Sequence, residues 1–288
     1  MDSSKIKWLH VEASSRCNAW CPACPRNIDG YGLRPGLVET DLDLEQFKSV
    51  LDEFPNLEAV QFCGNDGDPI AHSNFIDLID VIPDNVFIQI HTNGSLRNIG
   101  WWKKLAQTLE YRPHEIHFGI DGLEDTHKIY RQNTDWNKII ANAGEFITNK
   151  GRAVWQFIPF KHNQHQFMQC YALSKKLGFS DFKVVKTFRY HKSRAKNFKT
   201  GQEYKLEPSD FYLEMWHSTK PAASADCMHL SLPSVYLDTQ GRISACCYLA
   251  DSINFKNTTE LFAKLQINQD VIASTSVCQF WCSGLSDK

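Results

Sequence analysis

The sequence predicts an α/β protein: a partial (β/α)6 barrel of the TIM type, followed by a small C-terminal α+β domain. Three observations lead to this fold. Short β-rich segments alternate with helical patterns through the first two-thirds of the chain, as in βα units around a parallel sheet. The six β-rich segments are too few for a closed eight-stranded barrel. The alternation then stops, and a second group of cysteines follows near the C-terminus.

The barrel elements follow one another in regular order. The expected strands are Trp8–Glu12, Glu58–Cys63, Val86–Ile90, Glu115–Ile120, Ala153–Ile158 and Phe182–Lys186. The expected helices are Leu44–Phe54, Asn74–Val81, Trp101–Leu109, Trp136–Asn149 and Gln166–Leu177. Asp43 is a start signal for the first helix, and Gly178 is a plausible stop for the last one.

The chain after the last expected strand is different in character. The stretch Lys186–Lys205 carries seven Lys or Arg residues and one acid, Glu203, which indicates a linker or exposed loop. It is either a solvated surface or, around Lys192–Lys199, a contact for an anionic substrate or protein partner. Further on, Ser209–Ser218 has a helical pattern, and Asp238–Gly241 joins two β-rich segments, Val235–Leu237 and Arg242–Tyr248, as in a hairpin.

These patterns divide the chain into residues 1–190 as the barrel, 191–226 as a basic linker with a helix, and 227–288 as the C-terminal domain. The net charge of −2 gives no reason to expect a nucleic-acid partner. No apolar run approaches the ~20 residues that span a membrane, and the polar N-terminus lacks a signal-peptide core. We therefore expect a cytoplasmic protein.

Ten cysteines are unusual in that reducing compartment, where clustered cysteines indicate metal ligands or catalysts rather than disulfides. Cys63 and Cys170 are isolated in apolar segments and suit small core residues. The other eight form two groups. These are Cys17, Cys21 and Cys24 near the start, and Cys227, Cys246, Cys247, Cys278 and Cys282 near the end.

The first group has the spacing C-x3-C-x2-C and follows directly after the first expected strand, at the end of the barrel where chemistry is located. Three thiolates on one short loop can hold a [4Fe–4S] cluster and leave one iron open to a small molecule. Zinc is the competing metal, but its structural sites take four protein ligands. His10 is the possible fourth.

The string from Val11 to Arg26, with Cys17, Cys21 and Cys24 in this spacing, resembles the radical S-adenosylmethionine (radical SAM) superfamily, in particular the subgroup with a SPASM or twitch domain. The resemblance implies that SAM chelates the open iron and is cleaved reductively. The 5′-deoxyadenosyl radical then takes a hydrogen atom from the substrate. Ala23 stands where this family often has an aromatic residue near the adenine.

Short polar motifs after the next strands are similar to the segments of this family that bind SAM. Gly67-Asp68-Pro69 resembles Gly-Glu-Pro, which binds the SAM amino group, although an ordinary turn is the alternative. Thr92 and Asn93 resemble a Thr-Asn-Gly segment near the ribose or methionine part.

Three further positions resemble the SAM site of the family. Asp121 lies in Gly119-Ile-Asp-Gly, similar to Ser-Ile-Asp-Gly, so that Gly119 removes a hydroxyl. Asp121 could instead serve turn geometry. Arg131 suits the SAM carboxylate because a guanidinium binds carboxylates bidentately, though a surface arginine is the alternative. Asn163 is a candidate hydrogen-bond partner on the SAM side.

The second cysteine group fits the auxiliary-cluster pattern of the family. Cys227, Gly241 and Cys246 have the C-x(9–15)-G-x4-C spacing, and Cys278 and Cys282 supply two more thiolates. Four cysteines can ligate a second [4Fe–4S] cluster completely, and zinc is again the alternative. Neighbouring strand residues point to opposite faces, so we expect Cys246 rather than Cys247 as the ligand.

The function implied by the resemblance is that of a radical SAM oxidoreductase or maturase. A fully ligated auxiliary cluster favours a net oxidation, and the reductant would be a flavodoxin or ferredoxin. The alternatives are a radical SAM methyltransferase or lyase, and a non-catalytic iron–sulfur or zinc binding protein.

The expected substrate is a small molecule, a nucleotide or sugar, or a peptide. The sixteen residues before Cys17 leave no room for a leader-peptide domain, which weakens the hypothesis that the substrate is a peptide. Gln156, Arg189 and Tyr190 are candidate substrate contacts; no catalytic base is assigned.

Overall fold

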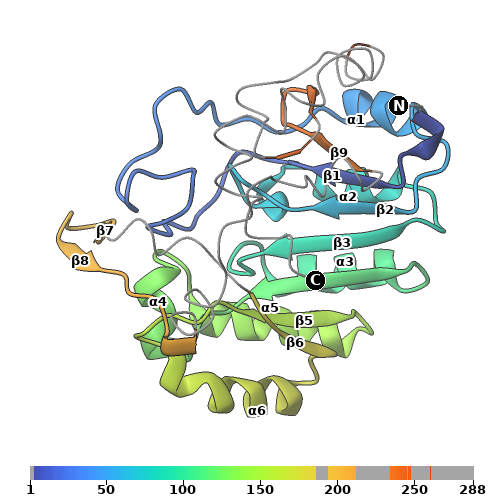
Figure 1. Cartoon of the computed structure of the whole chain (residues 1–288). Helices are drawn as coiled ribbons and strands as arrows, with labels where there is room; N and C mark the ends of the chain where they lie inside the picture. The colour runs from blue at the N-terminus through green and yellow to red at the C-terminus, as the bar shows by residue number, and fades with distance from the viewer. Residues whose placement is uncertain (1–2, 186–193, 212–233, 245, 248–259, 261–288) are drawn as a thin grey trace.

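Eight strands form one sheet in the order β10-β9-β1-β2-β3-β4-β5-β6 (Figure 1). The computed structural model describes residues 3–185, 194–211, 234–244, 246–247 and 260. The first six strands pair in parallel, each with the next along the chain. They are β1 (Trp8–Val11), β2 (Ala59–Phe62), β3 (Phe87–Thr92), β4 (His114–Gly119), β5 (Ala153–Phe157) and β6 (Asp181–Val184). The predicted partial barrel is therefore confirmed.

Helices connect these strands, as predicted. They are α1 (Leu44–Asp52), α2 (Phe75–Asp80), α3 (Ile99–Leu109), α4 (Glu124–Tyr130), α5 (Trp136–Thr148) and α6 (Phe167–Leu177), with 3-10 turns η1 (Ser3–Lys5), η2 (Pro69–Ala71) and η3 (Gln164–Gln166). The Asp43 carboxylate accepts the backbone N–H groups of Glu45 and Gln46, so it caps α1. Gly178 ends α6 with a φ of 87°, a conformation that glycine adopts without strain.

The helix-facing side of the sheet forms the core, with α2, α3 and α5 packed against it (Figure 1). Trp102 of α3 is fully buried, with its ring 5.1 Å from that of Phe118 on β4 and 6.1 Å from that of Phe146 on α5. Successive strand residues point to opposite faces, so the other face of the sheet carries the alternate residues. That face is polar along most of its length.

The C-terminal hairpin joins the barrel sheet instead of standing apart from it. Strand β9 (Ser234–Leu237) pairs in parallel with β1, and β10 (Ile243–Ser244) returns antiparallel to β9. The turn has the form that the sequence predicted. Gly241 has a φ of 74°, and the Asp238 carboxylate accepts hydrogen bonds from Gln240, Arg242 and the Arg242 side chain.

The prediction of a linker over Lys186–Lys205 was wrong for its second half. There β7 (Arg194–Lys196) and β8 (Glu203–Lys205) form a two-stranded antiparallel sheet. The turn between them is held by Asn197, whose side-chain oxygen accepts the N–H groups of Lys199 and Thr200. The buried side of this ribbon packs with Cys21 and Tyr130. Most of the predicted helix Ser209–Ser218 lies outside the described residues. Within the described part of the chain, no helix has the length and apolar character to cross a membrane.

Candidate functional site

The segments that follow β1 to β5 meet at one edge of the sheet, because the carboxyl ends of parallel strands lie side by side. The segment after β1 carries the cysteine loop. Cys21 is buried, whereas Cys17 and Cys24 are half-buried. Burial raises the pKa of the Cys17 thiol well above its usual value, and Asp68, Cys21 and Cys24 add to this. The three thiols therefore lie near one another, beside the segment that follows β2.

Polar groups from three segments approach these sulfurs. The backbone N–H of Ala19 donates to Cys17 Sγ at 3.3 Å, and Nδ2 of Asn93 lies 3.7 Å from the same sulfur. Cys24 Sγ lies 3.9 Å from the carbonyl oxygen of Asn65. The hydrogen bonds that Ala19 and Asn93 donate to Cys17 Sγ are of the kind by which proteins tune the potential of an iron–sulfur cluster.

Three cysteine thiols on one loop are the type of donor that an iron–sulfur cluster takes. Among the described residues, no three His, Cys, Asp or Glu side chains are arranged so that they could hold a metal ion. A four-iron cube is larger than an ion, and its thiolates stand correspondingly farther apart. His10, the possible fourth zinc ligand, has its Nε2 2.8 Å from the carbonyl oxygen of Cys63 and its ring 4.9 Å from that of Tyr236.

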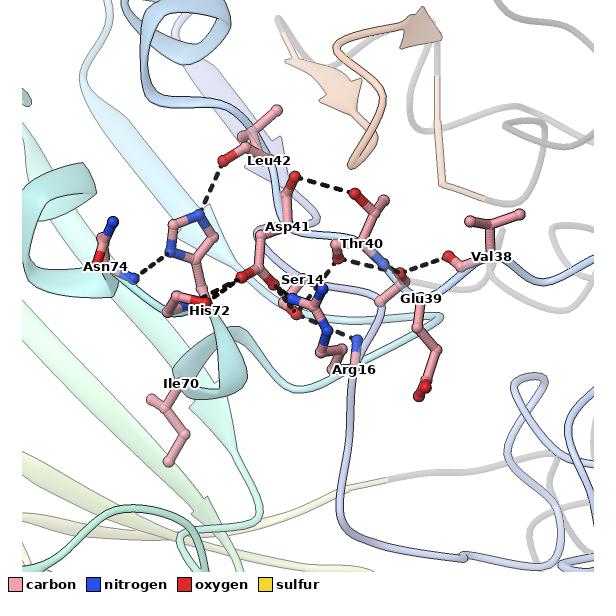
Figure 2. A network of polar contacts seen from close by, with 12 residues as sticks. Ser14, Arg16, Val38, Glu39, Thr40, Asp41, Leu42, Ile70, His72 and Asn74 are labelled. Carbon is pink, nitrogen blue, oxygen red and sulfur yellow. Dashed lines mark hydrogen bonds and ion pairs between the residues drawn. The ribbon is translucent and has the colours of Figure 1, made fainter.

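A polar network holds the segment just before Cys17, which includes Ser14 and Arg16 (Figure 2). The Asp41 carboxylate accepts hydrogen bonds from the Ser14 hydroxyl at 2.7 Å and from Ser73, and it pairs with the Arg16 guanidinium at 2.5 Å. Burial tends to raise the pKa of Asp41, but the hydrogen bonds from Ser14 and Ser73 lower it to about 2. Asp41 is therefore ionised at neutral pH and fixes the backbone on which Cys17 is mounted.

A carboxylate that the sequence analysis missed organises the segment after β2. Glu12 is fully buried directly after β1. Its Oε2 accepts the N–H of Asn65 at 2.7 Å, and its Oε1 accepts those of Asp66 at 3.2 Å and Gly67 at 3.0 Å. Three successive backbone N–H groups thus converge on the carboxyl group of Glu12, and we call this arrangement the Glu12 nest. The only signal in the sequence was an acid at the end of a β-rich segment.

Glycine is required at two positions of this nest because the backbone passes very close. A Cβ on Gly67 would lie 1.9 Å from the carbonyl oxygen of Ser14, and one on Gly64 would lie 1.9 Å from that of Gly67. Burial, followed by the charge of Asp66, raises the pKa of Glu12 to about 8. Glu12 therefore holds its proton in the folded protein near neutral pH.

Asp68 joins three of the segments. Its carboxylate accepts hydrogen bonds from the Thr92 hydroxyl at 2.9 Å and the Asn93 N–H at 2.8 Å, and its own N–H donates to the Arg16 carbonyl. Asp68 also caps η2, where Pro69 is the first residue. Burial raises the pKa of Asp68, although these hydrogen bonds oppose the shift. The predicted residues Gly67, Asp68, Pro69, Thr92 and Asn93 thus lie together beside the cysteine loop.

The segment after β4 carries a buried ion pair. Arg131 Nε donates to Asp121 Oδ2 at 2.6 Å, and Asp121 Oδ1 accepts the N–H of Ile158 at 2.7 Å. Burial tends to lower the pKa of Arg131, but Asp121 and then Cys21 raise it above its usual value. Arg131 therefore lies in the site near Cys21 and is not a surface arginine.

Gly119 makes room for this guanidinium. A Cβ on Gly119 would lie 2.7 Å from Arg131 Nη2 and 2.9 Å from Cζ. The space that a serine side chain would take at position 119 is thus filled by the guanidinium of Arg131.

Asn163 is fully buried and braces the segment after β5. Its Nδ2 donates to the carbonyl oxygens of Asp121 and Ile158, and its Oδ1 accepts the N–H of Phe160. Both polar atoms of the Asn163 side chain are already bonded to backbone groups. Its contact with SAM stays a prediction.

Gln156 lies on the polar face of the sheet, which we define as His10, Gln61, Gln89, His91, Glu115, His117, Gln156 and Lys183. Gln156 Oε1 is 3.4 Å from His91 Nδ1, and the His91 and His117 rings are 4.3 Å apart. Burial, and then His117, lower the pKa of His91 to about 3. The other two candidate substrate contacts, Arg189 and Tyr190, lie outside the described residues.

His117 belongs to a chain of three polar side chains on that face. Its Nε2 is 2.7 Å from Glu115 Oε1, which also accepts a 2.8 Å bond from Lys183 Nζ. Burial lowers the pKa of His117, so the imidazole is neutral. Its Nδ1 is buried and has no hydrogen-bond partner among the described residues.

Only part of the second cysteine group is described. Cys227, Cys278 and Cys282 lie outside the described residues, and Cys246 is buried in the hydrophobic core. The carbonyl of Cys247 accepts a 3.1 Å bond from the Asn65 side chain. Burial, and then Cys63, raise the pKa of the Cys247 thiol to about 12. Cys63 is thus near Cys247 and is not an isolated core residue.

Comparison with known proteins gives a consistent set of similarities. Residues 11–173 match the family model described as "Radical SAM superfamily". A Pyrococcus furiosus protein, the tungsten-containing aldehyde ferredoxin oxidoreductase cofactor-modifying protein, is 32% identical over 106 residues, which is 35% of this chain and 28% of that protein. The chain thus matches less than a third of that relative's length.

Two solved structures resemble the fold over most of the chain. Native anSMEcpe with bound AdoMet has a TM-score of 0.64 at 16% identity, covering 92% of this chain and 82% of that one. Streptococcus suis SuiB bound to its precursor peptide SuiA has a TM-score of 0.62 at 12% identity, covering 94% and 67%.

Proposed function

Because this chain belongs to the radical SAM superfamily, we propose that Cys17, Cys21 and Cys24 hold a [4Fe–4S] cluster at which the protein cleaves SAM. A bound cluster would supply one electron to SAM, which would split into methionine and a 5′-deoxyadenosyl radical that can take a hydrogen atom from the substrate. The observation that carries the proposal is the contact of Asn93 with Cys17 Sγ at 3.7 Å. It joins a predicted SAM-binding segment to the cysteine loop.

The residues around the cysteine loop are suited to hold the amino-acid part of SAM. The segment Gly67-Asp68-Pro69 is fixed by the Glu12 nest and by Thr92. Its carboxylate and backbone carbonyls can accept the N–H groups of an ammonium. Arg131 would bind the carboxylate of SAM while Asp121 keeps the guanidinium in place. Asn163 would act indirectly, by bracing Asp121.

We further propose that the C-terminal residues form a twitch domain in which Cys227, Cys246, Cys278 and Cys282 ligate an auxiliary [4Fe–4S] cluster. The Gly241 turn supports this assignment, because it reverses the chain and leaves four residues between Gly241 and Cys246. A fully ligated cluster would accept an electron from the substrate radical, which favours a net oxidation. Gln156, next to the last residue of β5, would contact the substrate.

Two classes of substrate are supported by the similar proteins. SuiB is recorded with a precursor peptide, which supports a peptide, and the Pyrococcus relative is named for cofactor modification, which supports a small molecule. The competing function is a non-catalytic binding protein in which zinc or an inert cluster occupies the cysteine sites.

Iron analysis after anaerobic reconstitution tests the proposal. We expect about eight irons in the wild type and about four in the Cys17/Cys21/Cys24→Ala variant, with dithionite-driven formation of 5′-deoxyadenosine only in the wild type. A colourless protein that holds stoichiometric zinc and stays free of iron would establish the binding-protein alternative instead.

A further inference from the structure

A cavity of about 630 Å³ opens beside the cysteine loop, and Cys17 is one of the residues that line it. The charged residues that line the cavity are Arg16, Arg97, Lys138 and Glu39. The side chain of Trp101 forms part of its wall. The cavity therefore brings the molecular surface to a residue that is proposed to ligate the cluster. None of the SAM-binding functions assigned above uses Arg97, Trp101 or Lys138.

The charge of this cavity is positive even when its ion pairs are included. Arg16 is paired with Asp41, and Glu39 is paired with Arg26. Arg97 donates to two carbonyl oxygens, those of Ile70 and His72. Carbonyl oxygens carry no net charge, so the guanidinium of Arg97 remains a cation at the surface. Lys138, in the first turn of α5, adds another.

An aromatic side chain lies among these cations. The Arg97 guanidinium stands 5.5 Å from the centre of the Trp101 ring, and Trp101 is only partly buried. Aromatic residues and arginine are the types enriched at the centre of protein interfaces. A basic rim around an aromatic centre fits an acidic protein surface better than a small anion, for which a tryptophan provides no ligand.

We propose that this basic cavity, made by Arg16, Arg97, Trp101 and Lys138, is the docking surface for the reductant, a small acidic flavoprotein of the flavodoxin type. The inference rests on the proposed function, because only a protein that reduces a cluster at Cys17 needs such a partner. One electron leaves the flavin hydroquinone, which becomes a semiquinone, and enters the oxidised cluster. Complementary charge would orient the carrier so that its flavin faces Cys17.

The experiment measures binding of a reduced or oxidised bacterial flavodoxin to the reconstituted holoenzyme by the fluorescence anisotropy of a labelled flavodoxin. The test variant is Lys138→Glu, a surface change on α5. The matched control is Lys104→Glu, an exposed position on α3 that does not line the cavity. Both variants change the net charge by the same amount, so they differ only in position.

We expect Lys138→Glu to weaken flavodoxin binding about tenfold at low salt, as the loss of one steering contact predicts. The difference should shrink at high salt because surface charges are screened. Lys104→Glu should bind flavodoxin within about twofold of the wild type. Formation of 5′-deoxyadenosine with dithionite, which needs no docking, should be the same in all three proteins.

Three results would overturn the proposal: equal flavodoxin binding by Lys138→Glu and the wild type, an equal loss in Lys104→Glu, or displacement of flavodoxin by inorganic phosphate but not by chloride at the same ionic strength. The last would identify a small-anion site. If the wild type forms no 5′-deoxyadenosine with dithionite, the proposed function fails, and that result is independent of the binding measurement.

Discussion

The phenol of Tyr236 donates a 2.8 Å hydrogen bond to Glu12 Oε2, across a separation of 224 residues in the chain. The same carboxylate accepts three backbone N–H groups from the segment after β2. A residue of the C-terminal hairpin therefore supports the nest that shapes the predicted SAM-binding segment. This connection gives the first prediction.

Tyr236→Phe should destabilise the protein by about 1–2 kcal/mol, because a buried acceptor loses its donor. It should also weaken binding of SAM while leaving the iron content unchanged. Urea unfolding and equilibrium dialysis with labelled SAM measure the two effects. Tyr111→Phe is the control, since Tyr111 is 90% exposed. Equal SAM affinity and stability in the wild type and Tyr236→Phe would contradict a supporting role for the hydroxyl.

Glu12→Gln should remove a component of the pH dependence of stability. Burial, followed by the charge of Asp66, raises the pKa of Glu12 from 4.5 to about 8. The folded protein therefore binds a proton that the unfolded chain has released. The resulting stabilisation is complete below pH 4.5 and is lost as the pH rises to about 8. Urea unfolding at several pH values between 6 and 8 should show a decline in the wild type, on the order of 1 kcal/mol per pH unit, that Glu12→Gln lacks. Parallel slopes would refute the assignment.

Gly119→Ala should weaken SAM binding by displacing Arg131. Its new methyl group would lie 2.7 Å from Arg131 Nη2, and the guanidinium would have to move away from Asp121. We expect at least a tenfold loss of SAM affinity with the full complement of iron. Gly144→Ala in α5 is the matched control, because no atom lies within 4 Å of its added Cβ and alanine favours a helix. An unchanged SAM affinity in Gly119→Ala would show that Arg131 does not bind SAM.

His114 and His117, three residues apart on β4, should be neutral in opposite tautomeric forms. His114 Nε2 accepts the N–H of Arg152 at 2.9 Å, so its proton is on Nδ1, 2.9 Å from the carbonyl of Arg112. His117 Nε2 faces the Glu115 carboxylate at 2.7 Å, so its proton is on Nε2. Long-range ¹H–¹⁵N spectra of histidine-labelled protein distinguish the two forms. Identical tautomers would contradict the arrangement around Glu115.

The strands and helices of the barrel were predictable because their signals are local. Asp43 caps α1 by bonding to N–H groups two and three residues ahead, and Gly178 ends α6 by its own backbone conformation. The cysteine loop was equally visible, since C-x3-C-x2-C needs only its own spacing. These features do not depend on distant parts of the chain.

The residues that were missed depend on distant partners. Glu12 gains its role only when the segment after β2 and Tyr236 converge on it. Lys183 on β6 bonds to Glu115 on β4 although β5 lies between these strands. The strands β7 and β8 are three residues each, and their basic composition resembles that of an exposed loop. The role of Gly119 was read as a lost hydroxyl, because the position of Arg131 could not be known from the sequence.

The pairing of β9 with β1 has a consequence for biosynthesis. Residues Trp8–Val11 leave the ribosome first, but their neighbour Ser234–Leu237 is made only after more than two hundred further residues. Contacts between distant segments form slowly, because a long loop must close before they are gained. The nascent barrel must therefore wait with one open edge, and unpaired strand edges promote aggregation. A ribosome that stalls before residue 234 would release a chain whose Glu12 carboxylate still lacks Tyr236, so we expect truncated products to depend on chaperones or to be degraded.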